Sequence, residues 1–179
     1  MDKVVKFFKH LPEVVSVHVV RYMDEFAQIK LTQAAQSPRL SRMLKLSDSS
    51  VTAIMALGGK VQVMVAFNFS GRLMERIKDQ AIVGLDIPED EQDLMIHEAA
   101  AEVINIVLGH AMNDMDKLGE TISLSPPIVI SEGKQLHQPR NACFAEASFG
   151  TEDGILRVLY IGPAALFDAK LNAKTDGVK

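Results

Sequence analysis

The chain has 179 residues, of which 47% are hydrophobic and 23% are charged, and this balance is that of an ordinary globular domain. Its formal net charge of -4 leaves no basic surface of the kind that binds nucleic acid, so we expect no nucleic-acid partner. The single cysteine, Cys143, excludes an intramolecular disulfide. Residues 3–9 are too short and too charged to form a signal peptide or a membrane span. We therefore expect one cytoplasmic domain over residues 1–179.

The first predicted element is a helix over residues 12–26. Proline suits the first helical position, and apolar residues recur at helical spacing at Val15, Val19, Tyr22 and Phe26. Residues 27–33 then predict a strand, and residues 34–48, with their mixed polarity and a Ser-Pro pair, predict a loop.

A β-hairpin is predicted next, with arms at residues 51–57 and 60–69. Gly58 and Gly59 between the arms permit a two-residue turn. The second arm alternates strictly, so one of its faces is expected to pack on a core at Val61, Val63, Val65, Phe67 and Phe69.

Two helices follow the hairpin. Ser70 is a suitable N-cap for a helix over residues 72–84. The longest predicted helix covers residues 88–118, because Pro88 and three following acids fit a helix N-terminus.

The C-terminal part predicts strands again. Residues 122–130 read as a strand interrupted by a Pro-Pro pair, and residues 141–149 and 155–161 form a second hairpin through Asp153 and Gly154. The element order predicts an α+β fold, in which a largely antiparallel β-sheet packs against long helices.

The long helix separates into two faces on a helical wheel. The core face carries Ile96, Ala100, Val103, Ile104, Val107, Ala111 and Leu118. The opposite stripe carries Glu91, Glu98, Glu102, Asn105, Gly109, Asn113 and Asp116. Such a stripe is usually only the solvated face of an amphipathic helix.

Two details favour a recognition role for this stripe. Gly109 lies in its middle, where glycine costs about 1 kcal/mol relative to alanine and removes bulk. No Lys or Arg occurs from Glu91 to Asp116, so no ion pair within the helix offsets the acidic charge. The stripe is therefore expected to meet a positively charged partner.

No metal site is predicted. His97-Glu98 begins like the zinc-protease motif His-Glu-x-x-His, but Ala101 occupies the position of the second histidine. Motifs for serine hydrolases and nucleotide binding are absent as well.

The segment Glu98-Ala-Ala-Ala-Glu102-Val-Ile-Asn105-Ile-Val-Leu-Gly109 resembles the signature helix of the CheC/CheX chemotaxis phosphatases. The Gly58-Gly59 hairpin and the Ser-Pro-Pro strand after the helix are similar to elements of that family. The resemblance is clearest over residues 50–162, whereas residues 1–48 diverge. It implies a CheX/CheC-like fold and an enzyme that hydrolyses the aspartyl phosphate of a CheY-like response regulator.

The resemblance also implies roles for single residues. Asn105 is expected to hold the attacking water in line with phosphorus, and Glu102 to pair with the regulator's active-site lysine. Independently of the resemblance, Glu98, one turn before Glu102, and Gly109, which removes bulk from the stripe, are expected to contact the partner. The family implies that Mg²⁺ belongs to the regulator, that this chain has no cofactor of its own, and that it forms a homodimer.

CheC-type members carry two such motifs and CheX-type members one. The first helix offers only Glu25-Phe-Ala-Gln28, in which glutamine replaces asparagine, so a CheX-type protein with one site is expected. Two alternatives stay open: a non-catalytic module that binds response regulators or flagellar-switch proteins, and a structural dimer with an acidic face.

Overall fold

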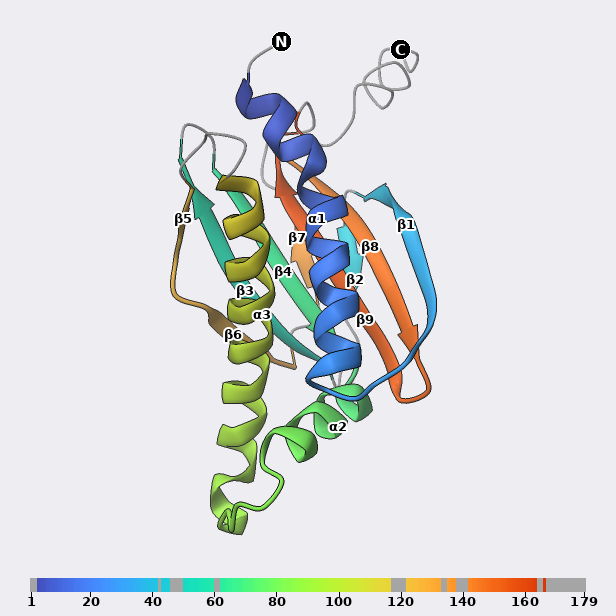
Figure 1. The fold of residues 1–179 in the computed structure, drawn as a ribbon, viewed down its shortest axis with the longest axis vertical. Coiled ribbons are helices and arrows are strands. Elements are labelled where there is room, and N and C mark those ends of the chain that lie inside the picture. Colours follow the sequence, from blue (N-terminus) through green and yellow to red (C-terminus); the bar gives the residue numbers. More distant parts are fainter. Residues whose placement is uncertain are drawn as a thin grey trace.

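The structure, a computed structural model, describes residues 3–41, 43–45, 50–59, 62–116, 122–132, 135–137, 142–163 and 166. An antiparallel β-sheet carries two long helices, α1 and α3, which lie side by side and run in opposite directions across one of its faces (Figure 1). The described elements are α1 (Lys3–Glu25), β1 (Leu31–Ser41), β2 (Met43–Lys45), β3 (Val51–Gly58), β4 (Val63–Phe69), α2 (Gly71–Ala81), a 3-10 turn (Glu89–Glu91), α3 (Gln92–Asp116), β5 (Ser123–Leu124), β6 (Ile128–Ser131), β7 (Gln135–His137), β8 (Cys143–Thr151) and β9 (Gly154–Gly162).

The main sheet has seven strands in the order β1-β8-β9-β4-β3-β5, and β6 also pairs with β3. Each described pairing in it is antiparallel. Strands β2 and β7 form a separate two-stranded sheet that the sequence did not predict. The predicted α+β class with a largely antiparallel sheet is confirmed.

The hydrophobic core lies between the sheet and the long helices. Strand β4 shows why: Val63, Val65, Phe67 and Phe69 are each at most 1% exposed, so one face of the alternating strand is buried. The predicted alternation is confirmed for these four residues, and Val61 lies outside the described residues. None of the helices in the described part of the chain is long and apolar enough to cross a membrane.

Helix α1 is longer than predicted at its N-terminus. It begins at Lys3, and Pro12 lies inside it instead of at its start. Proline disfavours a helix interior by about 3 kcal/mol. Phe8 and Leu11 are completely buried on the preceding turns, and this packing outweighs the local preference.

The predicted end of the first helix is also corrected. Helix α1 stops at Glu25, and Phe26 is 55% exposed, so it does not continue the core stripe of Val15, Val19 and Tyr22. Gln28 adopts a positive φ of 54° in the turn that follows. The chain leaves the helix there because a left-handed residue cannot continue it.

Strand β1 corrects two predictions. It begins at Leu31, so the predicted strand over residues 27–33 starts too early, and it occupies residues 31–41, most of which predicted a loop. Pro38 is compatible with this strand because β1 lies at the edge of the sheet and its register shifts between Ala35 and Arg39.

The first hairpin has a longer connection than the predicted two-residue turn. Leu57 pairs with Val63, so residues 58–62 connect the arms. Gly58 instead continues β3 and pairs with Ser123 of β5. A Cβ atom at Gly58 would lie 2.7 Å from Ser123 Oγ, so a larger residue there would require the Ser123 side chain to move.

Helix α2 ends at Ala81, three residues before the predicted end. Ser70 is its N-cap residue, as predicted, but the Ser70 side chain does not cap the helix. Its Oγ instead accepts a hydrogen bond from the backbone N–H of Ile155 at 3.1 Å. The serine thus fixes the start of α2 to β9.

The remaining predicted elements are confirmed over the described residues. The 3-10 turn and α3 cover the long helix up to Asp116, and β5 and β6 flank the Pro-Pro interruption. Strands β8 and β9 form the second hairpin, in which Thr151 pairs with Gly154. Cys143 is the first residue of β8 and lies within the predicted arm of residues 141–149.

Candidate functional site

The predicted polar stripe is a surface ridge on α3. Glu98, Glu102, Asn105 and Gly109 are all exposed, and we call these four residues the α3 ridge. The predicted core face is confirmed for the buried residues Ala100, Val103, Ile104, Val107 and Ala111. Ile96 is partly buried against the core, and Leu118 lies outside the described residues.

The charged and amide side chains of the ridge have no partners within the described part of the chain. No hydrogen bond or ion pair there involves the side chains of Glu98, Glu102 or Asn105. Glu102 and Asn105 are three residues apart on a helix, a spacing that places side chains about 5–6 Å apart at Cβ. Both can therefore reach one group of a docked partner.

The surroundings of the ridge are acidic. Between Lys78 and Lys117 the sequence contains ten Asp and Glu residues and no Lys or Arg. Lys78 itself is 7% exposed, and its ammonium group lies 2.9 Å from Glu75 and donates a hydrogen bond to Gln92 at 3.0 Å. The hydrogen bond with Glu75 helps to raise the pKa of Lys78. This lysine is thus engaged locally and does not neutralise the ridge.

No packing contact among the described residues requires glycine at position 109. A Cβ atom added there would meet nothing within 4 Å. Glycine at this position therefore destabilises the helix relative to alanine, and the described part of the chain offers no packing reason for it.

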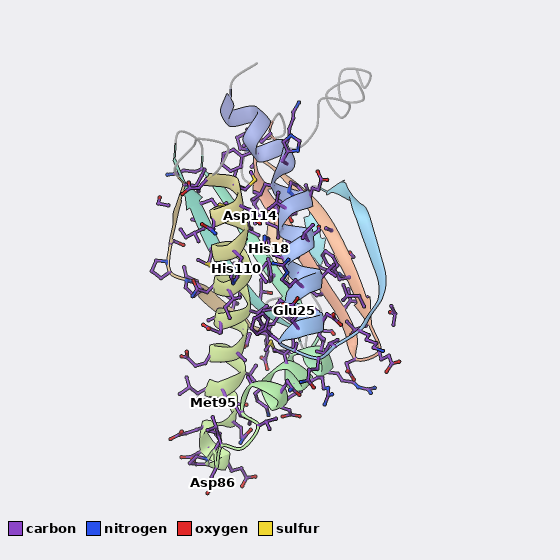
Figure 2. All side chains as sticks on the ribbon, in the orientation of Figure 1. His18, Glu25, Asp86, Met95, His110 and Asp114 are labelled. Carbon is purple, nitrogen blue, oxygen red and sulfur yellow. The ribbon has the colours of Figure 1, made fainter. Side chains whose placement is uncertain are left out.

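Helix α1 is fixed beside the ridge through a polar contact. His18, which is only 6% exposed, lies with Nε2 2.9 Å from Oδ2 of Asp114 on α3. The rings of His18 and His110 stack with their centroids 5.8 Å apart. Figure 2 shows His18, His110 and Asp114 gathered where the two helices meet.

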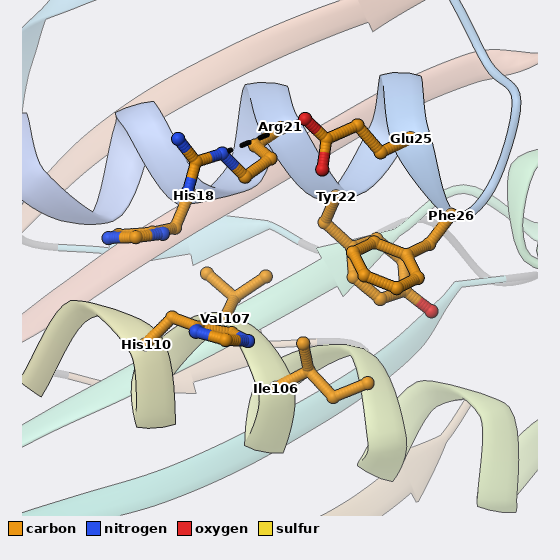
Figure 3. Close-up of a pocket in the computed structure, with 8 residues that line it drawn as sticks. All are labelled: His18, Arg21, Tyr22, Glu25, Phe26, Ile106, Val107 and His110. Carbon is orange, nitrogen blue, oxygen red and sulfur yellow. Dashed lines mark ion pairs between the residues drawn. The ribbon is translucent and has the colours of Figure 1, made fainter. Parts of the chain in front are cut away.

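A half-open pocket of about 140 Å³ lies between α1 and α3 (Figure 3). The stacked rings of Tyr22 and Phe26 form one side, with centroids 5.6 Å apart. Ile106, which directly follows Asn105, lines the α3 side. The remaining lining residues are His18, Arg21, Glu25, Val107 and His110.

The pocket and the α3 ridge are neighbours. Burial raises the pKa of the Tyr22 hydroxyl, and the negative charge of Glu102 raises it further. Ile106 lines the pocket and lies one turn after Glu102 on α3, so the pocket lies beside the ridge on its α1 side.

Sequence reasoning missed the pocket residues as part of the site. It assigned Tyr22 and Phe26 to the core because of their helical spacing, but Phe26 is exposed and lines the pocket. The only sequence feature that could have indicated the pocket was an aromatic residue, Phe26, near the predicted end of the first helix. Glu25 is the last residue of α1 and Gln28 lies in the turn beyond it, so these two do not reproduce the helical spacing of Glu102 and Asn105.

Within the described residues, no three His, Cys, Asp or Glu side chains lie close enough together to hold a metal ion. The exposed carboxylate and carboxamide of the ridge are suited to hydrogen bonding and charge pairing with a partner macromolecule.

Residues 51–149 match the family model described as chemotaxis phosphatase CheX. No curated protein matches the chain. A chemotaxis protein CheX from Desulfovibrio desulfuricans has the same fold, with 18% identity, a TM-score of 0.69, and coverage of 84% of this chain and 97% of that one.

Two further solved structures share the fold at low identity. A CheX-CheY-BeF3-Mg²⁺ complex from Borrelia burgdorferi matches with 15% identity and a TM-score of 0.60, over 84% of this chain and 95% of that one. Thermotoga maritima FliY matches with 14% identity and a TM-score of 0.57, over 99% of this chain and 98% of that one.

Proposed function

The chain belongs to the CheX family of chemotaxis phosphatases, and we propose that it hydrolyses the aspartyl phosphate of a CheY-like response regulator at the α3 ridge. The observation that carries the proposal is the pair Glu102 and Asn105, both exposed and without partners among the described residues, on the helix that bears the family motif. The Borrelia complex, in which a CheX protein is bound to CheY, supports the class of partner.

Asn105 positions the attacking water in this proposal. Its carboxamide both accepts and donates hydrogen bonds, so it orients a water without being consumed. The water oxygen attacks phosphorus, the bond from phosphorus to the aspartyl oxygen breaks, and inorganic phosphate and a free aspartate carboxylate result. Such a reaction passes through a loose transition state, for which positioning supplies much of the catalysis.

Glu102 pairs with the lysine of the regulator's active site and thereby sets the register of the complex. Its exposed carboxylate lies on a helix without Lys or Arg and has no ion-pair partner among the described residues, so it is available to a cation of the partner. We assign Mg²⁺ to the regulator in this proposal; the Borrelia complex contains this ion together with CheX and CheY.

The test is the decay of phosphorylated CheY-like receivers encoded in the same genome, with wild-type protein and with Asn105→Ala. We expect fast, Mg²⁺-dependent phosphate release with wild type and a loss of about 100-fold or more with Asn105→Ala. Asn113→Ala is the matched control because Asn113 is exposed on the same helix, two turns further on.

Two outcomes would contradict the proposal. Equal decay with wild type and Asn105→Ala would remove Asn105 from the chemistry. Binding of phosphorylated receivers without any acceleration of decay would identify a non-catalytic docking module instead.

We also propose that the protein is a homodimer that pairs through the edge of its sheet. Strand β6 lies along the outer side of β3 and exposes Ile128 (65%) and Ile130 (40%). Exposed apolar residues on an edge strand favour association with a second strand. Light scattering should give twice the chain mass of 19.6 kDa, and Ile128→Asp should lower it.

A further inference from the structure

The pocket between α1 and α3 has the size of a site for one side chain. A cavity of about 150 Å³ is known to hold one benzene molecule, whereas sites for small-molecule ligands usually measure about 300–1,000 Å³. The pocket of about 140 Å³ therefore fits a single leucine-sized or aromatic side chain.

The walls of the pocket are those of a protein contact point. Tyr22, Phe26, Ile106 and Val107 provide apolar walls, and the rings of His18 and His110 line the pocket beside them. Arg21 and Glu25 pair with each other at 3.8 Å on its rim. The rim charges thus compensate one another. An apolar centre with a polar rim is the arrangement in which interface residues contribute most to binding.

The position of the pocket indicates which partner fills it. Ile106 follows Asn105 in sequence, and the charge of Glu102 acts on Tyr22 inside the pocket. Stable protein complexes bury about 800 Å² on each partner, which is far more than two side chains on one helix provide. A receiver that brings its phosphoaspartate to Asn105 must therefore cover neighbouring surface as well.

Charge complementarity points to the same partner. The surface beside the pocket carries Glu98 and Glu102 and no cation of its own helix, so it suits the basic group that accompanies an aspartyl phosphate. A second copy of this chain would bring the same acidic helix against itself and repel it.

We propose that the α1–α3 pocket receives one apolar side chain of the phosphorylated receiver and thereby determines which receiver is dephosphorylated. This inference rests on the proposed function, because the phosphorylated receiver is the occupant. Phe26 is the pocket residue that selects between receivers in this proposal, since it is 55% exposed and lines the pocket (Figure 3).

The experiment compares wild type with Phe26→Ala, Phe26→Leu and the control Val17→Ala. Val17 is 56% exposed on α1, the helix that Phe26 directly follows, and it does not line the pocket. Three quantities are measured: the KM and the kcat of receiver dephosphorylation, and the Kd for receivers loaded with beryllium trifluoride and Mg²⁺. Circular dichroism verifies that each variant is folded.

We expect Phe26→Ala to raise both KM and Kd about tenfold while kcat stays near that of wild type. Phe26→Leu should retain most of the affinity because it keeps an apolar wall. Val17→Ala should behave as wild type.

The outcomes separate the two proposals. If Phe26→Ala binds and turns over like wild type while Asn105→Ala is inactive, the pocket proposal is overturned and the phosphatase stands. If wild type binds the loaded receiver without turnover and Phe26→Ala weakens binding, the pocket proposal is supported and the phosphatase fails. If none of the loaded receivers binds, both are overturned.

Discussion

Tyr22 on α1 and Glu102 on α3 are electrostatically coupled across the contact between the two long helices. Burial, and after it the negative charge of Glu102, raise the pKa of the Tyr22 hydroxyl above its ordinary value of 10.0. A tyrosinate at this position would lie close to a carboxylate, so the neutral phenol is favoured. The coupling joins a pocket residue to the ridge residue proposed to hold the partner's lysine.

The first prediction follows from this coupling. Glu102→Gln removes one negative charge beside Tyr22, so the Tyr22 pKa should fall relative to wild type while remaining above 10.0 because of burial. The measurement is an NMR titration of ring-labelled tyrosine. Glu98→Gln, one turn away on the same ridge, is the control and should change the Tyr22 pKa less. An unchanged Tyr22 pKa in Glu102→Gln would contradict the geometry.

The second prediction concerns stability at alkaline pH. Burial raises the pKa of both tyrosines in the chain, Tyr22 and Tyr160. Above about pH 10 the unfolded chain loses these protons while the folded chain keeps them, so the free energy of unfolding should fall as pH rises further. Urea titrations from pH 8 to pH 11 measure this fall, and ionisation of the fully buried Tyr160 should appear together with unfolding. Tyr22→Phe should make the fall less steep; tyrosinate at Tyr160 in the folded protein would contradict the prediction.

Much of the α3 ridge could be predicted from sequence because one helix determines it. A helix fixes the angle between successive side chains, so the spacing of the apolar residues in α3 is enough to predict which side chains are buried. It correctly predicts that Val103 and Ile104 are buried and that Glu102 and Asn105 are exposed. The antiparallel sheet was predictable for a similar reason, since alternation marks the strands locally and Asp153-Gly154 marks the turn of the second hairpin.

The pocket could not be predicted in the same way. It depends on which turn of α1 packs against which turn of α3, and no local pattern encodes that pairing. Phe26 has the spacing of a core residue but lies one position beyond the helix end, where the chain turns away at Gln28. The early start of α1 was missed because the burial of Phe8 outweighs the tendency of Pro12 to begin a helix. Strand β1 was missed because Pro38, which usually indicates a loop, is tolerated at the edge of a sheet.

The third prediction tests the contact that holds α1 beside α3. His18→Ala removes a buried ring and its hydrogen bond to Asp114, and we expect a loss of about 1–3 kcal/mol in the free energy of unfolding. The control is His10→Ala, because His10 is half exposed and lies 3.8 Å from Glu13 in a surface pair that contributes little. Denaturant unfolding at pH 7 compares the two. Equal stability of both variants would show that the interhelical contact is dispensable.

The fourth prediction concerns the turn between β8 and β9. Gly154 has a φ of 136°, and a Cβ atom there would overlap Ser70 Oγ. Gly154→Ala should therefore destabilise the fold by about 1–3 kcal/mol through backbone strain and this collision. Ser70→Ala removes the oxygen, so the double variant should lose less than the sum of the two single losses. Strict additivity in urea unfolding would mean that the collision does not occur.

The fifth prediction separates stability from binding at Gly109. A Cβ atom fits there without contact, so Gly109→Ala should raise the free energy of unfolding by about 0.5–1 kcal/mol, because alanine favours a helix interior. If the receiver approaches the ridge closely, the added methyl group should at the same time raise the KM for dephosphorylation. Asn113→Ala serves as the control for a change elsewhere on the exposed face. A more stable protein with weaker substrate binding cannot result from partial unfolding, so this combination would assign Gly109 to the partner interface. A stabilised protein with an unchanged KM would show that the receiver's surface does not come close to Gly109.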